Sequence, residues 1–315
     1  MTTTHLALVG PTASGKSVAA LAIARELGDV EIVSVDSMQG YREMDIGTAK
    51  PSAAEQAAVR HHLLDIADPA EDLNVARYQE LARAAVADIA GRGKRALLVG
   101  GTGLYFQAVV DDLRFPGEDL ELRAELERRT AEPGGIAAAY TELERLDPLA
   151  ASRIDPHNAR RVVRALEVIE LTGEPFSSFG PGVQSFGPTA FPVHLVGLWL
   201  PREALVGRIA ERVAVMRERG LWAEVERLRR LPAWSRTARQ AIGYKEILDV
   251  IDRGDGGAAS DAAAVDDAFE TIARRTRSFA RRQRMWFRRD PRITWVGGGG
   301  NPCGRVGAVL ALWRR

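Results

Sequence analysis

A glycine-rich segment near the N-terminus has the spacing of a phosphate-binding loop. It fits the pattern G-x4-G-K-[ST] and lies between an apolar run at 5–9 and an alanine-rich helical stretch at 17–27. The loop consists of Gly10, Pro11, Thr12, Ala13, Ser14, Gly15, Lys16 and Ser17. Its glycines let backbone N–H groups converge on phosphate oxygens, and the following helix N-terminus adds partial positive charge. Lys16 adds a point charge, and the Ser17 hydroxyl is a ligand for a phosphate-bound Mg²⁺. The loop predicts binding of a di- or triphosphate, ATP included, without establishing phosphoryl transfer.

An acidic residue at the end of the next apolar run could complete this site. P-loop ATPases usually need a carboxylate at the end of a neighbouring strand to hold Mg²⁺. The run at 95–101 ends in glycines, whereas the run at 31–36 ends in Asp36. At the carboxyl edge of a sheet, Asp36 would face the cleft where α/β folds bind ligands. It could assist the metal or accept a proton from a nucleophile.

Short apolar runs separated by helix-length segments predict the elements that position these residues. Strands are expected at 5–9, 31–36, 95–101, 193–200 and 293–296. The alternation predicts an α/β fold with a P-loop NTPase-like core, in which crossover helices connect the strands of a parallel sheet. Residues 118–171 show only helical periodicity, and 173–192 are rich in Gly, Pro and Ser. We therefore predict a catalytic core of residues 1–114 and 191–315, interrupted by an all-helical domain over 115–190.

The net charge of +1 conceals a strong asymmetry along the chain. Residues 1–114 carry 11 basic and 15 acidic side chains (−4), residues 115–190 carry 8 and 13 (−5), and residues 191–315 carry 24 and 14 (+10). Within 274–289 there are eight arginines and no acid, and Ile272, Phe279 and Trp286 recur every seven residues. This pattern predicts a helix with an apolar face on the core and arginines outward, which suits a polyanionic partner.

The composition excludes several other classes of protein. The 315 residues are 46% hydrophobic, but no run reaches the ~18 apolar residues of a membrane span, and no basic region precedes the first apolar stretch. The single cysteine, Cys303, forbids an internal disulfide and a cysteine-rich zinc site. The adjacent His61 and His62 lack a suitably spaced third ligand, so a metal site there is disfavoured. A cytoplasmic location is expected.

Four further segments, taken with the phosphate loop, carry a resemblance to a known family. They are VDSMQGYREMDIGTAKP at 35–51, HHLLDIADP at 61–69, LLVGGTGLYFQAVVDDL at 97–113 and RQAIGYKEI at 239–247. In this order they resemble bacterial tRNA dimethylallyltransferases, over nearly the whole chain. That family transfers the dimethylallyl group of dimethylallyl diphosphate to N6 of the adenosine at position 37, in tRNAs that read codons beginning with U. It needs Mg²⁺ and releases diphosphate.

The resemblance implies roles for individual residues. Asp36 corresponds to the general base toward the adenine amine, Thr12 to Ser17 contact the prenyl donor, and Arg239 helps to neutralise the diphosphate. The residues implied on the tRNA-facing side, besides Asp36, are Ser37, Met38, Gln39, Thr102, Arg123, Arg160, Arg161 and Arg164. The inserted helical domain corresponds to the part of the family that grips the anticodon stem-loop. The resemblance also implies a monomer.

Three other functions stay open at this point. A small-molecule kinase of the P-loop class would use the phosphate loop, Asp36 and a helical lid, but it does not account for the basic C-terminal region. A P-loop RNA-binding switch would bind tRNA in a nucleotide-dependent way without forming a product. An adenylate isopentenyltransferase would perform the same chemistry on a free nucleotide, and the long insertion argues against it.

Overall fold

The computed structural model describes residues 4–180, 182–253, 262–297 and 303–314. The contacts between residues divide the chain into two units. The core unit comprises Met1–Asp111 and Pro188–Arg315, and the inserted unit comprises Asp112–Gly187. The sequence places the insertion at 115–190, so each boundary lies three residues earlier in the structure.

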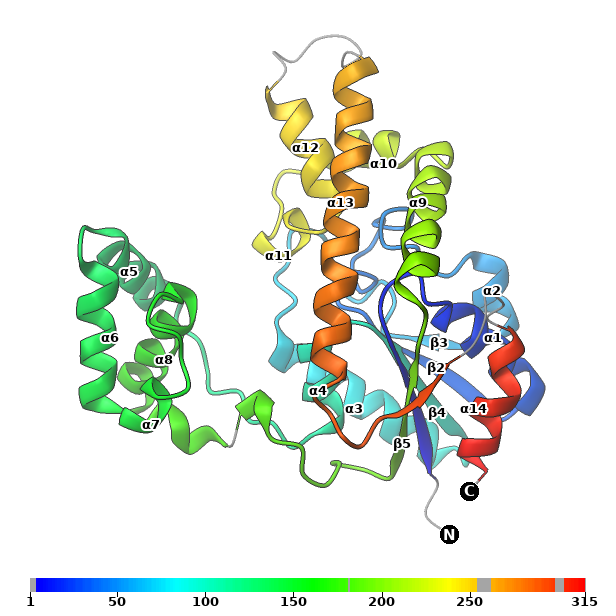
Figure 1. The fold of residues 1–315 in the computed structure, drawn as a ribbon, viewed down its shortest axis with the longest axis horizontal. Coiled ribbons are helices and arrows are strands. Elements are labelled where there is room, and N and C mark those ends of the chain that lie inside the picture. The colour runs from blue at the N-terminus through cyan, green and yellow to red at the C-terminus, as the bar shows by residue number, and fades with distance from the viewer. Residues whose placement is uncertain (1–3, 181, 254–261, 298–302, 315) are drawn as a thin grey trace. The chain divides into compact units, whose positions relative to one another are not determined.

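The core unit is built on a six-stranded sheet in which every neighbouring pair of strands is parallel (Figure 1). The strands are β1 (His5–Val9), β2 (Val30–Val35), β3 (His61–His62), β4 (Arg95–Gly100), β5 (Val193–Leu198) and β6 (Thr294–Val296). Their order across the sheet is β3-β2-β4-β1-β5-β6. The parallel sheet confirms the predicted α/β fold. The two-residue strand β3 is an addition to the strands expected from the sequence.

Each face of the sheet has its own covering of helices. Successive residues of a strand point to opposite faces. On β1, Leu6 and Leu8 pack in one apolar cluster with α1 (Lys16–Leu27) and α14 (Val306–Trp313). Ala7 and Val9 belong to the larger cluster on the other face, formed with α3 (Val75–Gly91) and α4 (Gly103–Val110). The carboxyl ends of β1, β2 and β4 therefore meet at one edge, between two packed helical layers.

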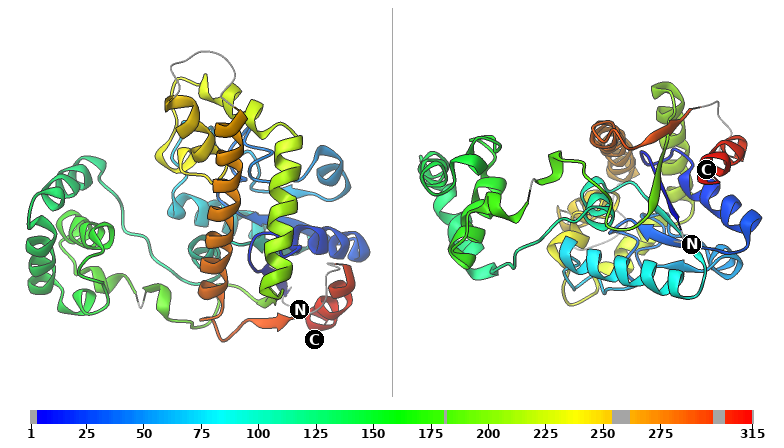
Figure 2. Two further views of the ribbon diagram at one scale, coloured as in Figure 1. Left: turned by 45° about the horizontal axis from the view of Figure 1, so that its top comes forward. Right: turned by 90° about the horizontal axis from the view of Figure 1, so that it is seen from below.

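Further helices follow β5. They are α9 (Arg202–Glu218), α10 (Leu221–Arg229), α11 (Arg236–Arg239), α12 (Tyr244–Arg253) and α13 (Ala262–Phe287). Helix α13 spans 26 residues and runs beside α9 in both views of Figure 2. It confirms the predicted arginine-rich helix. Ile272 is buried and Trp286 packs against the main core, whereas Phe279 is only half-buried and lies under the guanidinium of Arg282.

Helices are the regular elements of the inserted unit among its described residues, as predicted. Its helices are α5 (Leu120–Ala131), α6 (Gly135–Leu146), α7 (Pro148–Ala151) and α8 (Ala159–Thr172). Two 3₁₀ turns follow, Phe176–Phe179 and Gly182–Gln184. Apolar residues of these helices, among them Leu126, Leu143 and Leu166, form a separate core. This unit therefore has the packing of an independent helical domain.

The two chain segments at the base of the insertion are joined within the core unit. Asp111 and Thr189 form an antiparallel bridge, and the N–H of Ala190 donates to the carbonyl of Val110 over 2.8 Å. Arg292 adds ion pairs to Asp111 and to Asp290, each with a contact of 2.7 Å.

In the described part of the chain, no helix has the length and apolar character needed to cross a membrane.

Candidate functional site

The phosphate loop leads directly from β1 into α1. Gly15 precedes the helix with a φ of 90°, a conformation that a residue with a Cβ atom adopts only with strain. No side chain caps α1 and no acidic residue occupies its first turn. The N–H groups of that turn are therefore directed at a bound anion. The Ser14 hydroxyl is buried and has no hydrogen-bond partner among the described residues, which fits a loop that encloses a polar ligand.

Contacts from distant parts of the chain hold this loop in shape. The N–H of Thr12 donates to Gln283 Oε1 over 2.8 Å, and Arg305 donates to the carbonyl of Ser14 over 3.2 Å. Within the loop, Lys16 Nζ donates to the carbonyl of Pro11 over 2.7 Å. The loop is thus organised before any ligand binds, and this reduces the entropy lost on binding.

The ammonium group of Lys16 sits in surroundings that favour its neutral form. Burial lowers the pKa of Lys16 to about 7, from 10.5 for an ordinary lysine. The charge of Asp36 opposes this change, and the charge of Arg212 reinforces it. A diphosphate would reverse the balance, because an anion stabilises the protonated amine. A pKa shifted this far from its ordinary value is typical of residues in functional sites.

Asp36 follows directly after β2 at the same edge of the sheet. Its Oδ1 accepts a hydrogen bond of 3.0 Å from the N–H of Met38, which fixes the orientation of the carboxylate. Burial raises the pKa of Asp36 above the ordinary value for an aspartate. The Met38 N–H and the charges of Arg212 and Lys16 oppose that rise. A carboxylate with a raised pKa is a stronger base.

Arg212 is a site residue that the sequence reasoning missed. It lies in α9, and its charge affects the pKa of both Asp36 and Lys16. Burial lowers the pKa of Arg212 itself, and only Asp36 offsets this effect. The chain contains 39 arginines, so nothing in the sequence distinguishes this one. The packing of α9 against the core brings it to Asp36 and Lys16.

The segment after Asp36 is held by its own polar contacts. Gln39 accepts from Ser34 and donates to the carbonyls of Thr48 and Ala49, so its side-chain amide is already engaged. Ser37 is buried and Met38 is half-buried beside the main core. Only the exposed part of this turn is therefore accessible to a substrate.

Two buried charged residues shape the loop at 45–50. Lys50 Nζ donates to Asp45 and Asp65 over 2.6 Å each, and to the carbonyl of Tyr41 over 2.8 Å. Glu224 of α10 accepts the N–H groups of residues 45–47 and the hydroxyl of Tyr244. These contacts explain the lysine in GTAKP as a structural residue.

Thr102 directly precedes α4 and follows Gly100, the last residue of β4, and Gly101. It is half-buried, and its side chain makes no capping hydrogen bond to the helix. The strand ends approach closely here, since a Cβ atom on Gly100 would lie 2.2 Å from the carbonyl oxygen of Val35. Asp36 and Thr102 therefore follow adjacent points of neighbouring strands.

Comparison with known proteins decides which family this architecture represents. The sequence model described as IPP transferase matches residues 39–290. A tRNA dimethylallyltransferase of Bifidobacterium longum (strain NCC 2705) is 48% identical over 300 residues, which cover 94% of this chain and 87% of the relative. The chain belongs to the IPP transferase family. A tRNA dimethylallyltransferase of Kineococcus radiotolerans is 49% identical over 315 residues, with 98% of this chain and 95% of the relative covered.

Solved structures of IPP transferases share the fold. The full-length tRNA isopentenylpyrophosphate transferase of Bacillus halodurans is 36% identical, with a TM-score of 0.65 and 99% of each chain covered. A eukaryotic dimethylallyltransferase, captured in crystallographic snapshots acting on tRNA, is 26% identical with a TM-score of 0.76. There the match covers 94% of this chain and 74% of that one.

In this IPP transferase, Arg239 forms an ion pair with an acidic side chain. It is exposed in α11 and binds Asp252 over 2.8 Å, a carboxylate that it shares with Arg229. The arginine whose charge acts on Asp36 and Lys16 is Arg212. The role of Arg239 on the diphosphate stays a prediction, and its ion-pair partner in the structure is Asp252.

The arginines expected to contact tRNA from the insertion differ in their surroundings. Arg123 and Arg164 both bind Glu167, which is fully buried in α8, over 3.0 and 2.8 Å. Burial alone would raise the pKa of Glu167, but these guanidinium groups outweigh it and hold the pKa below its ordinary value. Arg160 and Arg161 are exposed at the start of α8. The positive charge that the four arginines could present together is therefore reduced, because the carboxylate of Glu167 neutralises part of it.

One histidine of the pair, His62, belongs to a charged cluster at the opposite end of β2, whereas His61 is hydrogen-bonded to the carbonyl of Val59. His62 Nε2 lies 2.7 Å from Glu31, a buried carboxylate that also binds Arg92 and Lys94. No group of three His, Cys, Asp or Glu side chains that could hold a metal occurs among the residues the structure describes. The arrangement favours a structural role for His62.

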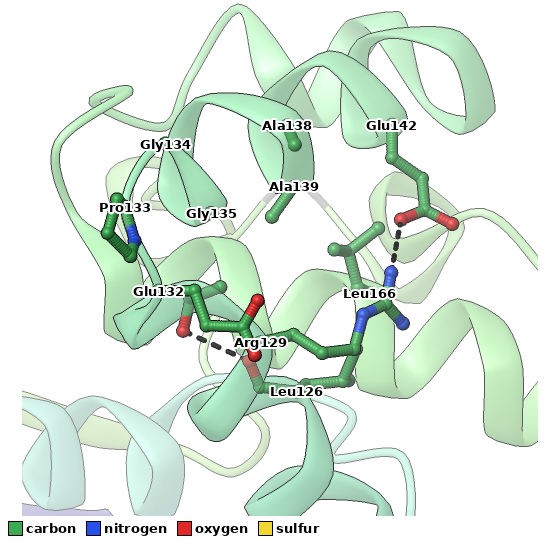
Figure 3. Close-up of a pocket in the computed structure, with 11 residues that line it drawn as sticks. Leu126, Arg129, Glu132, Pro133, Gly134, Gly135, Ala138, Ala139, Glu142 and Leu166 are labelled. Atoms are coloured by element: carbon green, nitrogen blue, oxygen red, sulfur yellow. Dashed lines mark hydrogen bonds and ion pairs between the residues drawn. The ribbon is translucent and has the colours of Figure 1, made fainter.

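A pocket of about 360 Å³ lies entirely within the inserted unit (Figure 3). It is bordered by Leu126, Arg129, the turn at 133–135, Glu142 and Leu166. Arg129 and Glu142 form an ion pair of 3.4 Å at its rim. The phosphate loop and Asp36 belong to the core unit, so this pocket is separate from the candidate site.

Proposed function

We propose that this protein transfers the dimethylallyl group of dimethylallyl diphosphate to N6 of adenosine 37 in the anticodon stem-loop of tRNA. The observation that carries the proposal is the meeting of a phosphate loop with a partly desolvated carboxylate. Lys16 and Asp36 follow β1 and β2, the two strands that flank β4, and they influence each other's pKa. Membership of the IPP transferase family supports this reaction over the alternatives.

The chemistry needs a base on one side and a charge-stabilising loop on the other. The exocyclic amine of adenine is a weak nucleophile, because its lone pair is conjugated into the ring. As N6 bonds to the allylic carbon, the carbon–oxygen bond to diphosphate breaks and the amine loses a proton. Asp36 would accept that proton, a contribution of roughly 10²–10⁴ in rate. The oriented Met38 N–H keeps the carboxylate in position.

The diphosphate leaves with growing negative charge, which the loop would stabilise. Backbone N–H groups of the first turn of α1 and the ammonium of Lys16 stabilise this charge more strongly in the transition state than before it. Arg212 adds a further positive charge near the carboxylate of Asp36. The developing allylic cation must also be kept away from water. The half-buried positions of Lys16 and Asp36 favour this exclusion.

We include Mg²⁺ in the proposal as the cofactor of the diphosphate. The Ser17 hydroxyl, exposed at the start of α1, is an oxygen donor of the type that Mg²⁺ prefers. The ion would supply charge neutralisation for the leaving diphosphate. ATP binding, the monomeric state and the cytoplasmic location stay predictions.

The deciding experiment combines the purified protein with unmodified tRNA, dimethylallyl diphosphate and Mg²⁺. Mass analysis of the tRNA nucleosides should show N6-dimethylallyladenosine at position 37, and a tRNA with guanosine at that position should show none. Free adenosine monophosphate serves as the competing acceptor for a nucleotide-modifying enzyme. Rapid ATP turnover without tRNA, together with no prenylated nucleoside, would instead indicate a P-loop kinase or ATPase.

Asp36→Asn provides the matched inactive variant for this assay. Asparagine keeps the shape of the side chain and an oxygen acceptor for the Met38 N–H, but it is not a base. Transfer should fall by about 10²–10⁴, with tRNA affinity nearly unchanged. Asp68→Asn, which alters an exposed aspartate paired with Arg42, is the control and should keep full activity. Normal turnover by Asp36→Asn would reject the base role.

A further inference from the structure

The side chain of Gln283 joins the two segments that must hold the two substrates. Its Oε1 accepts the N–H of Thr12 in the phosphate loop over 2.8 Å. Its Nε2 donates to the carbonyl of Gly101, next to Thr102, also over 2.8 Å. One amide thus spans the phosphate loop, at the donor side, and the β4–α4 turn, at the implied tRNA side.

The surroundings of Gln283 are closely packed and largely shielded from water. The side chain is only 5% exposed, so both hydrogen bonds form largely away from water. A Cβ atom on Gly101 would lie 2.4 Å from Nε2 of Gln283 and 3.2 Å from the carbonyl oxygen of Gly10. The phosphate loop, the turn and the glutamine therefore approach as closely as a bare backbone permits. Loss of the amide would leave the part-buried N–H of Thr12 and the buried carbonyl of Gly101 without these partners, which is energetically unfavourable.

The last turns of α13 reinforce the same contact. The indole of Trp286 covers Gly103, where a Cβ atom would lie 2.4 Å from the ring. Phe287 meets Phe106 of α4 edge to face, with ring centroids 5.6 Å apart. These aromatic contacts fix α13 on α4, and they leave Gln283 as the polar link from that anchored helix to the phosphate loop.

We propose that Gln283 is a positioning residue for prenyl transfer, which sets the phosphate loop against the β4–α4 turn so that the allylic carbon and the adenine amine are in line. This inference rests on the proposed function. Gln283 touches neither substrate in this role, because both of its polar groups are engaged by the backbone. Gln283 sets the distance between the phosphate loop and the β4–α4 turn. It does not set the affinity of either segment for its substrate.

The expected consequence is a loss of rate with little loss of binding. A displacement of about 1 Å between reacting groups lowers rates by up to about 100-fold. Gln283→Met removes both hydrogen bonds in a side chain of similar size. Its single-turnover rate, with both substrates saturating, should fall about 10- to 100-fold. The affinities for tRNA and for a non-reactive donor analogue should change far less.

A second variant separates the two halves of the link. Gln283→Glu keeps an oxygen acceptor for the Thr12 N–H but loses the donor to Gly101. Hydrogen exchange at the Thr12 amide should therefore stay slow in Gln283→Glu and become fast in Gln283→Met. The rate should fall in both, because the positioning role needs both contacts.

Thr276→Ala is the control for general weakening of α13, since Thr276 is a buried residue of the same helix. Thermal unfolding and the active-site titre of each variant correct for misfolded protein. A normal single-turnover rate in Gln283→Met would overturn the proposal, and so would an equal loss of rate in Thr276→Ala. An inactive wild-type protein would reject the proposed function itself, a result distinct from active wild type with unaffected variants.

Discussion

The lysine of the phosphate loop and the aspartate after β2 influence each other through a poorly hydrated environment. Burial pushes both toward the neutral form, lowering the pKa of Lys16 and raising the pKa of Asp36. Their opposite charges partly compensate. Binding of a diphosphate adds negative charge beside Lys16, so it stabilises the ammonium form. Donor binding and protonation at this residue should therefore be coupled.

The first prediction concerns the pH dependence of donor binding. With the pKa of Lys16 near 7 in the free protein, the amine is largely neutral at pH 8 and must take up a proton when the anion binds. Affinity for a non-reactive donor analogue should therefore fall as the pH rises from 7 to about 9. Below pH 7 this effect should level off, because the amine is already protonated.

Calorimetry at pH 8 in buffers with different ionisation enthalpies measures this proton uptake. Lys16→Arg is the comparison variant, because its guanidinium stays protonated throughout and should flatten the pH dependence. Equal apparent binding enthalpies in all buffers would contradict the coupling.

Helices and strands with a regular local sequence pattern could be predicted from the sequence, whereas elements that depend on pairing with distant segments could not. Strands β1, β2 and β4 are mostly apolar and are buried along nearly their whole length, which is typical of strands covered on both faces. Strand β3 has only two residues, and pairing with β2 defines it. Its local sequence therefore contains too little information to predict a strand.

Packing between residues far apart in the sequence also determines which arginine affects Asp36 and Lys16. Arg212 and Asp36 are distant in the sequence, and no spacing rule relates them. Conversely, Arg164 lies three residues before Glu167 on one face of α8, a spacing at which side chains meet. Local helix geometry alone is enough to bring this pair together. The convergence of Arg123 on the same carboxylate depends on how α5 packs against α8.

The second prediction tests this ion-pair cluster as an internal support of the inserted unit. Glu167→Gln removes the charge that Arg123 and Arg164 share, and the cluster also holds the N–H of Asp119 at the start of α5. The free energy of unfolding of the inserted unit should fall by about 2 kcal/mol.

Hydrogen exchange followed by peptide mass analysis would localise the effect. Peptides from α5 and α8 should exchange faster, whereas those from the sheet of the core unit should not change. Glu170→Gln, an exposed residue of the same helix, is the matched control. Unchanged exchange in α5 would show that apolar packing alone holds it.

Across the whole molecule, charge is distributed unevenly between segments. The residues before and within the insertion carry net charges of −4 and −5, and the residues after it carry +10. Helix α13 concentrates many of these positive charges, and its apolar side is fixed on the core. Such a helix can attract an RNA backbone without recognising bases.

The third prediction is a salt dependence that an exposed arginine of α13 controls. Arg281→Ala should weaken tRNA binding uniformly across tRNA sequences and reduce the slope of log K against log salt by about 1. Filter binding over a series of salt concentrations measures this slope. Arg314→Ala, which makes the same charge change at the end of α14, should leave it unaltered. Equal slopes for wild type and Arg281→Ala would place the RNA backbone elsewhere.

The bridge between Asp111 and Thr189 also bears on how the polypeptide folds as it is synthesised. Strand β1 lies between β4 and β5, and β5 emerges from the ribosome only after the whole insertion. Until then, β1 has one open edge, where a stray strand could pair. A helical insertion that folds locally and closes at its base replaces a long flexible loop with a short one, which lowers the entropy cost of bringing β5 to β1. Early folding of α5 to α8 would thus shorten the period in which the open edge of β1, the strand before the phosphate loop, can pair with another strand.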